Sequence, residues 1–171
     1  MTRSEFNAQV FDISMSILNG FNSSSEYDKK YVLPEYDQLQ LSHYIGEKFE
    51  AAFRGELKAR NIPCRAGNPK DINEDDIIIP GNRNLDIETK VATRRYTKNG
   101  KISKPHWWTD RNQKSDKLRN FIFIEFEYVN GEFKFHKIYV SFQRMSYMDI
   151  KTNNITEKIV KKYSDLVYTD E

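Results

Sequence analysis

Apolar residues recur at helical spacing in three parts of the chain. Thr2 to Leu18 carries them at intervals of three and four residues and is followed by Gly20, where a helix can stop. Tyr36 to Arg60 repeats this pattern over a longer stretch, which predicts a long amphipathic helix. Between them, Asn22 to Glu35 is rich in Ser, Asp and Lys, and we expect a loop there. Ile155 to Val167 predicts a last helix.

Shorter apolar runs in the middle of the chain predict strands. Asp76 to Ile79 and Leu85 to Thr93 are expected to form a hairpin across Pro80 to Asn84. Asn120 to Tyr128 and Glu132 to Phe142 are rich in aromatic and β-branched residues, and the Asn-Gly pair between them is a strong hairpin signal. The sequence therefore predicts two hairpins.

The order of these elements predicts an α/β fold of the α+β type, with a mixed sheet of four to five strands flanked by helices. A crossover with a short helix near Thr109 to Leu118 is expected between the hairpins. A chain of 171 residues is large enough for one domain with a core of its own. We expect residues 1–37 to form an N-terminal helix and loop, residues 38–145 the core, and residues 146–171 a C-terminal helix.

Composition bears on location and covalent chemistry. The single cysteine, Cys64, can form no internal disulfide. Met1 to Gly20 contains charges and lacks the long apolar run of a signal peptide or membrane span. A mean hydropathy of -0.77 describes a polar surface, and 13% aromatic residues argue against a disordered chain. We expect a cytoplasmic protein with no membrane partner.

Positive charge is concentrated in one segment. Thr93 to Arg119 holds nine basic residues against Asp110 and Asp116, a net of +7 in a chain whose formal charge is +2. The rest of the chain therefore carries −5, and such a distribution suits a polyanionic ligand. A solvated loop is the competing interpretation.

The first predicted hairpin, DDIIIPGNRNLDIETKV at residues 75–91, has charged side chains at regular intervals. Side chains alternate between the two faces of a strand, so Asp86, Glu88 and Lys90 are expected to share one face. The opposite face, directed at the core, would hold Leu85, Ile87, Thr89 and Val91.

This arrangement can hold a hard cation. The end of the paired strand, at Asp75 or Asp76, is expected beside Glu88, which brings two carboxylates together with the ammonium of Lys90 next to them. Mg²⁺ prefers oxygen ligands and is commonly held by one or two carboxylates, waters and substrate phosphate oxygens. An exposed cross-strand ion pair between Glu88 and Lys90 is the alternative.

DDIII followed by LDIETKV resembles the signature of the PD-(D/E)xK nuclease superfamily, in which an aspartate opens one strand and an acid-x-lysine triplet lies on the next. The order of a helix, a hairpin, a crossover and another strand is also similar to that family's core, and the resemblance covers roughly Leu39 to Val140. It implies that Asp76 and Glu88 are metal ligands and that Lys90 is the catalytic lysine. Asp75 stands where the motif has proline, so the choice between Asp75 and Asp76 stays open.

The helix before the hairpin offers further carboxylates. Members of the superfamily often add a metal ligand from this helix, and the resemblance makes Glu47 and Glu50 the candidates. Their spacing of three residues puts them on one helical face. Solvent-exposed helix glutamates are the competing interpretation.

The basic segment is expected to bind double-stranded DNA, because Lys and Arg contacts with phosphates supply most of the nonspecific affinity. Trp107 and Trp108 can stack on a base, wedge into a groove or anchor the segment on the core. Asn112 and Gln113 carry the groups that read adenine. The predicted DNA-binding residues are Arg94, Arg95, Lys98, Lys101, Lys104, Trp107, Trp108, Arg111, Asn112, Gln113 and Lys114.

Within the superfamily, the compact chain looks most like a stand-alone type II restriction endonuclease, an enzyme that uses Mg²⁺ to hydrolyse DNA at one sequence. Since one active site cuts one strand, a double-strand break in a palindrome implies a homodimer. Two alternatives remain open. One is a structure-specific or repair nuclease of the same fold, similar to a junction resolvase, and the other is a nonenzymatic DNA-binding module with a structural acidic hairpin.

Overall fold

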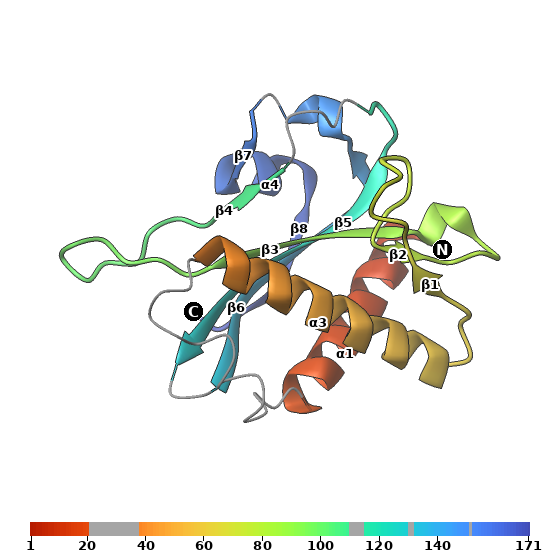
Figure 1. The fold of residues 1–171 in the computed structure, drawn as a ribbon, viewed down its shortest axis with the longest axis horizontal. Helices are drawn as coiled ribbons and strands as arrows, with labels where there is room; N and C mark the ends of the chain where they lie inside the picture. The colour runs from red at the N-terminus through yellow and green to blue at the C-terminus, as the bar shows by residue number, and fades with distance from the viewer. Residues whose placement is uncertain (21–37, 110–114, 130–131, 151) are drawn as a thin grey trace.

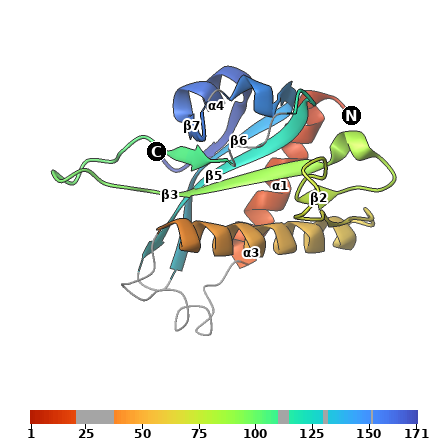
Figure 2. The same cartoon turned by 45° about the horizontal axis from the view of Figure 1, so that its top comes forward.

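The structure, a computed structural model, describes residues 1–20, 38–109, 115–129, 132–150 and 152–171. In these parts of the chain a mixed sheet lies between two layers of helices (Figure 1). Helices α1 (Arg3–Gly20) and α3 (Gln38–Ala59) cover one face, and α4 (Glu157–Tyr163) lies on the other (Figure 2). The architecture is therefore mixed α/β, as the sequence predicts.

The main sheet has six strands, more than the four to five expected. In spatial order they are β1 (Arg65–Ala66), β2 (Ile77–Ile78), β3 (Ile87–Thr93), β5 (Arg119–Val129), β6 (Glu132–Met145) and β8 (Asp165–Thr169). β3 and β5 run parallel, and the other neighbours are antiparallel. A second, two-stranded sheet pairs β4 (His106–Trp108) with β7 (Asn154–Thr156). Two 3₁₀ turns are η1 (Arg83–Leu85) and η2 (Tyr147–Asp149).

The central strand β5 is buried on both faces. Ile122 and Ile124 pack with α1 and α3, whereas Phe121 and Phe123 pack with Trp107 on the side of α4. All four β5 side chains are 0% exposed. Because helices or strands cover both faces, this strand reads in the sequence as an unbroken apolar run.

The two long helices confirm the periodicity of the sequence. α3 buries a stripe of apolar side chains that recur every four residues against β3 and α1: Ile45, Phe49, Phe53 and Leu57. α1 contributes a matching row at Phe6, Val10, Ile13 and Ile17. The loop expected over Asn22 to Glu35 lies outside the described residues.

Both predicted hairpins are present. The first is short, because β2 and β3 share only the pair Ile77 and Ile87. Its connection is closed by Asp86, whose carboxylate accepts hydrogen bonds from the Ile79 backbone N–H at 2.8 Å and from Arg83 Nε at 2.6 Å. In the second, β5 and β6 pair along most of their length, and the Asn-Gly turn between them lies outside the described residues.

The helix predicted over Ile155 to Val167 is wrong at both ends. Ile155 belongs to β7, where it pairs with Trp107, and Leu166 lies in β8 at the edge of β6. The helix α4 begins after Thr156, whose side chain accepts a hydrogen bond from the Ile159 N–H at 3.4 Å. The apolar spacing is compatible with a helix throughout, but the residues at both ends form strands instead, because their backbones pair with β4 and β6.

Two other expectations from the sequence concern a helix and the membrane. Of the short helix predicted over Thr109 to Leu118, residues 110–114 lie outside the described residues, and residues 115–118 form neither helix nor strand. Among the residues that the structure describes, no helix has the length and apolar character needed to cross a membrane.

Candidate active site

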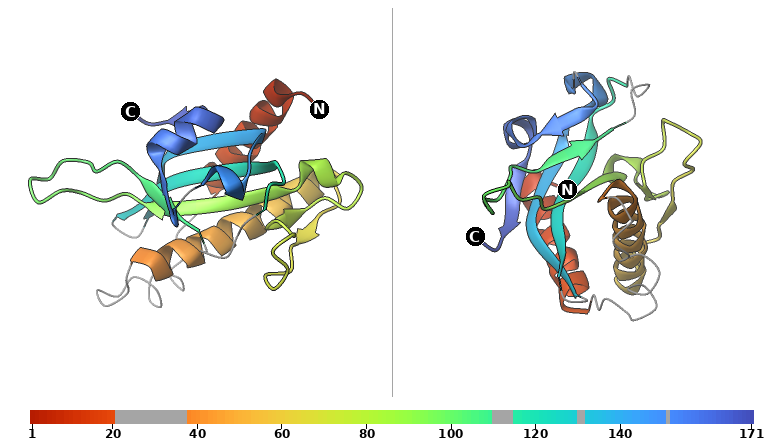
Figure 3. Two further views of the ribbon diagram at one scale, coloured as in Figure 1. Left: turned by 90° about the horizontal axis from the view of Figure 1, so that it is seen from above. Right: turned by 60° about the vertical axis from the view of Figure 1, so that its left-hand side comes forward.

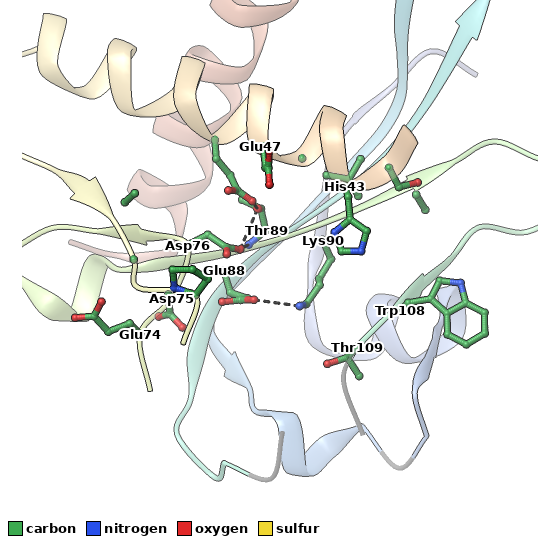
Figure 4. A pocket seen from close by; sticks show the side chains of 18 of the residues that line it. His43, Glu47, Glu74, Asp75, Asp76, Glu88, Thr89, Lys90, Trp108 and Thr109 are labelled. Atoms are coloured by element: carbon green, nitrogen blue, oxygen red, sulfur yellow. Dashed lines mark hydrogen bonds and ion pairs between the residues drawn. The ribbon is translucent and has the colours of Figure 1, made fainter. Parts of the chain in front are cut away.

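A cavity of about 900 Å³ lies along the edge of β3 that faces away from β5. β2 covers this edge only at Ile87, and no other strand in the described part of the chain pairs with the rest of it. Side chains from α3, from the residues before β2, from β3 and from β4 line the cavity (Figure 4), and Tyr147 of η2 also belongs to the lining. The short β2 strand therefore leaves room for a site on the sheet edge.

Two carboxyl groups, those of Asp76 and Glu50, contact Thr89. Asp76 Oδ2 accepts hydrogen bonds from the Thr89 backbone N–H at 2.9 Å and lies 3.1 Å from the Thr89 hydroxyl. The same hydroxyl contacts Oε1 of Glu50, which reaches down from α3. A hydroxyl has one proton, so it can donate to one of these carboxyl groups and accept from the other when that group is protonated. A single proton held by the pair would complete both hydrogen bonds.

The pKa values agree with a shared proton. Burial raises the pKa of Glu50 to about 8, and the negative charge of Asp76 adds to the shift. Burial likewise raises the pKa of Asp76 to about 7, with Glu88 as the next cause. Removal of carboxylates from water and their mutual repulsion both disfavour the charged form. The cluster is therefore short of positive charge.

Lys90 supplies one cation to this cluster. Its Nζ lies 3.0 Å from Oε1 of Glu88, and its side chain is only 15% exposed. Burial is the largest single influence and lowers the pKa of Lys90, but the charges of Glu88 and Asp76, the Tyr147 hydroxyl and the hydrogen bond to Glu88 together outweigh it, so the pKa is raised. Lys90 therefore stays an ammonium, which can neutralise charge or hold a water but cannot accept a proton as a base.

The ion pair differs from the exposed cross-strand pair that the sequence left as an alternative. Glu88 and Lys90 lie on the same strand and share a face, as predicted, but the ring of Tyr147 lies beside that face and both side chains are largely buried. The opposite face carries Thr89, which was expected to point to the core. Its hydroxyl instead reaches the carboxyl groups.

The two adjacent aspartates have different partners. Asp75 is buried in an ion pair with Arg119, and Lys117 Nζ lies 3.6 Å from its other oxygen. Asp76 joins Thr89 and the carboxyl cluster instead. Of the two aspartates, only Asp76 therefore keeps its carboxyl group free of an arginine or lysine partner among the described residues and beside Thr89.

Gly67 fixes the backbone of this aspartate pair. A Cβ atom at Gly67 would lie 1.8 Å from the carbonyl oxygen of Asp75, and the Gly67 N–H donates to the carbonyl oxygen of Asp76 at 3.1 Å. Only a residue without a side chain allows this approach. The turn signals around Gly67 in the sequence indicated a connection but gave no hint of this contact.

The two candidate glutamates of α3 also have different environments. Glu50 is largely buried and joins the cluster, whereas Glu47, one turn earlier, is exposed on the cavity wall (Figure 4). Seven carboxylates line the cavity against three cationic side chains, Arg54, Lys90 and Arg95. The seven are Glu47, Glu50, Asp71, Glu74, Asp75, Asp76 and Glu88. Asp75 is paired with Arg119 and Glu74 with Arg65, but the remaining five carboxyl groups still outnumber the cations, so the wall attracts cations and repels a bare phosphate.

Tyr147 belongs to the site, and no motif in the sequence pointed to it. Its ring lies 5.4 Å from Nζ of Lys90 and 4.9 Å from the guanidinium carbon of Arg119. Its hydroxyl is buried and lies close to Glu88 and Lys90, although it makes no hydrogen bond of regular geometry with the described residues. Burial raises the pKa of Tyr147, so the hydroxyl keeps its proton and can donate it in a hydrogen bond.

Within the described residues, no three side chains of the His, Cys, Asp and Glu types already surround one point as a metal cage. Mg²⁺ seldom needs such a cage, because it keeps several waters and uses one or two carboxylates. Asp76 and Glu88 fit that donor set, and Glu50, which contacts Thr89 beside Asp76, is a further carboxyl group of the cluster.

The basic segment divides into buried and exposed residues. Arg94 is buried and pairs with Glu125 at 2.8 Å, and Trp107 donates its indole N–H to the Ile124 carbonyl at 2.9 Å. Neither is placed to contact DNA, and of the roles considered for Trp107 the structure confirms that of a core anchor. Other predicted DNA-binding residues are exposed: Arg95, Lys98, Lys101, Lys104 and Trp108. Arg111, Asn112, Gln113 and Lys114 lie outside the described residues.

The carboxyl cluster predicts an unusual pH dependence of stability in the metal-free protein. Glu50 and Asp76 have raised pKa values of about 8 and about 7, so between pH 4 and pH 8 the folded state binds more protons than the unfolded state. The free energy of unfolding should therefore fall as pH rises through this range. Urea unfolding in EDTA at several pH values measures this slope.

Glu50→Gln should flatten that slope and make the metal-free protein more stable than the wild type at pH 8, because it removes a carboxyl group that must ionise in a buried position. Glu56→Gln on the same helix is the matched control and should keep the wild-type slope. Equal slopes for all three proteins would contradict the shared-proton arrangement.

The buried ion pair of Arg94 leads to a prediction about stability. Arg94→Ala leaves Glu125, which is 0% exposed, without its cation, and should lower the free energy of unfolding. Breaking a buried pair in this way costs roughly 3 to 5 kcal/mol. Lys98→Ala, exposed in the same segment, should change it by about 0.5 kcal/mol or less. A stable Arg94→Ala protein with weakened DNA binding would instead make Arg94 a DNA contact.

Comparison with protein-family models, curated protein sequences and solved structures finds no match to this chain. The site combines a carboxyl cluster on an open sheet edge, a buried ammonium beside it, and exposed cations just beyond the end of the same strand.

Proposed function

We propose that the protein is a Mg²⁺-dependent endonuclease that hydrolyses phosphodiester bonds of double-stranded DNA at a specific sequence, as a type II restriction enzyme does. The observation that carries the proposal is the meeting of Asp76, Glu88 and the Lys90 ammonium on the free edge of β3. These are the three positions that match the PD-(D/E)xK motif. We further propose one nuclease domain over residues 1–171, located in the cytoplasm.

The electrostatics of the cavity support a bound divalent cation. Asp76 and Glu88 would hold it, with Glu50 as a further ligand after loss of its proton. When bound, Mg²⁺ would polarise a phosphate and lower the pKa of a water. The excess of carboxyl groups over cations on the wall makes DNA binding unfavourable until bound cations offset the negative charge. Cation binding and DNA binding should therefore be cooperative.

The side chains around the carboxylates have distinct roles in this proposal. Thr89 fixes the carboxylate of Asp76 through its backbone N–H and hydroxyl. Lys90, permanently charged, stabilises negative charge that develops on the phosphate or orients the attacking water. Tyr147 keeps its proton and offers a donor to a phosphate oxygen.

Sequence specificity and dimerisation are proposed from the surface beside the cavity and from the symmetry of the DNA. Exposed cations and Trp108 beside the cavity are suited to a nucleic acid, and the homodimer follows from the need to cut two strands of a palindrome. The parallel pairing of β3 with β5 after a crossover supports a core similar to that of the nuclease superfamily. A junction resolvase-like or repair nuclease and a nonenzymatic DNA-binding module remain as alternatives, and cleavage products distinguish them.

The direct test is incubation of the purified protein with phage DNA and Mg²⁺, followed by gel electrophoresis. Discrete bands are expected. A smear would indicate a nuclease without sequence specificity, and cleavage confined to branched DNA would indicate a resolvase. Binding without cleavage would leave only the nonenzymatic module.

Substitutions at the three motif positions provide the residue-level prediction. Asp76→Asn, Glu88→Gln and Lys90→Ala should each lower the single-turnover cleavage rate by about 10² to 10³ or more, because each removes a charge used in the transition state. Duplex affinity measured in Ca²⁺ should change less than the cleavage rate does.

Glu56→Gln changes the charge of α3 outside the cavity and should cleave at the wild-type rate. Thermal unfolding of each preparation separates loss of catalysis from loss of fold. Normal cleavage by both Glu88→Gln and Lys90→Ala would show that the site has been assigned to the wrong residues.

A further inference from the structure

Between β3 and β4 the chain leaves the body of the protein as a narrow two-stranded arm (Figures 1 and 3). Tyr96 and Ile102 form an antiparallel bridge, and the Thr97 N–H donates to the Lys101 carbonyl at 2.7 Å. A turn at Gly100, with φ of 76°, closes the tip. We call residues 95–104 the basic arm.

The composition of the basic arm is one-sided. It carries four cations, Arg95, Lys98, Lys101 and Lys104, all in exposed residues, and contains no Asp or Glu. Its two bridged apolar side chains, Tyr96 and Ile102, are 50% and 49% exposed. Like charges repel along such a narrow ribbon, and a polyanionic partner would relieve this repulsion.

The base of the basic arm is firmly attached to β5. Arg94 forms its buried ion pair with Glu125 just before the arm begins, and the Tyr96 hydroxyl contacts both carboxylate oxygens of Glu127 at 2.8 Å. Trp107, just after the arm ends, is buried in the core. The arm therefore has a fixed direction, although its tip touches little else.

The basic arm is also tied to the candidate active site. It continues directly from β3, the strand of Glu88 and Lys90. Arg95 at its base lines the same cavity as the carboxyl cluster, and so does Trp108, which is 57% exposed. A ligand that places a phosphate in the cavity would therefore extend toward the arm.

The dimensions of the arm match one feature of duplex DNA. The major groove, about 12 Å wide and 8.5 Å deep, admits a two-stranded β-ribbon, whereas the minor groove is about 6 Å wide. The arm rises about 10 Å between Arg95 and Lys98 at the usual rise of an extended strand. Lysine and arginine in the major groove donate to guanine O6 and N7 and to the flanking phosphates.

We infer that the basic arm enters the major groove of a DNA duplex whose backbone crosses the cavity. The inference rests on the proposed function for the position of the duplex, but binding by the arm is measurable without cleavage. Lys98, Lys101 and Lys104 are its principal contacts, and Ile102 supplies apolar contact with the groove, while Tyr96 anchors the base on Glu127.

The test compares two charge-matched triple variants. Their affinity for a 30-base-pair duplex in Ca²⁺ is measured by fluorescence anisotropy at several salt concentrations. The arm variant is Lys98→Gln, Lys101→Gln and Lys104→Gln. The control is Lys58→Gln, Lys158→Gln and Lys162→Gln, on the exposed surfaces of α3 and α4. The arm variant should reduce the slope of log affinity against log salt by about two to three units, at about 0.9 per lost phosphate contact.

The control variant should keep the wild-type slope. In a separate competition experiment, methyl green, a major-groove ligand, should displace the wild-type protein from the duplex, whereas netropsin, a minor-groove ligand, should not. Equal slopes for the two variants, displacement by netropsin alone, or no duplex binding by the wild type would each overturn the inference. Duplex binding through the arm without cleavage in Mg²⁺ would refute the proposed function and leave the groove assignment standing.

Discussion

The strand β3 is supported unequally on its two edges, and the site depends on that asymmetry. On one edge it pairs with β5 at seven positions, and on the other it meets β2 at a single pair. The N–H of Thr89 on the open edge therefore has no strand partner and instead binds the carboxylate of Asp76. A longer β2 would satisfy that N–H with a backbone carbonyl and fill the space of the cavity. The unpaired part of the β3 edge thus leaves space in which the side chains of the site can contact a ligand.

The charge of the site is balanced only in part by the protein itself. Glu88 has the ammonium of Lys90, whereas Glu50 and Asp76 share the hydroxyl of Thr89 and keep a proton near neutral pH. Burial of carboxyl groups without a cation costs free energy unless they are protonated. A divalent ion would take the place of that proton. The proposed binding of metal and the predicted pH dependence of stability therefore have the same physical cause.

Neighbouring residues of like chemistry receive different environments throughout the region. Arg94 faces the core and Arg95 the cavity, and Trp107 is buried whereas Trp108 is exposed. These pairs lie in or directly beside extended segments, where successive side chains point to opposite sides. One member of each pair stabilises the fold and the other is available to a ligand. Between these anchored positions the basic arm projects from the body of the protein.

The sequence by itself determined the elements whose signal is local. Helical and strand periodicity predicts the apolar stripe of α3, in which buried side chains recur every four residues, the hairpin of β5 and β6, and the shared face of Glu88 and Lys90. Only the tertiary structure decided that Asp76 rather than Asp75 joins the carboxyl cluster, since Arg119 is distant in sequence and takes up Asp75.

The tertiary structure likewise brought Glu50 and Tyr147 to the site from separate elements, and it divided the predicted C-terminal helix among β7, α4 and β8. Periodicity describes which face of an element is apolar. It does not describe which backbone edges remain unpaired or which buried charge finds a partner, because these depend on contacts between residues far apart in the chain.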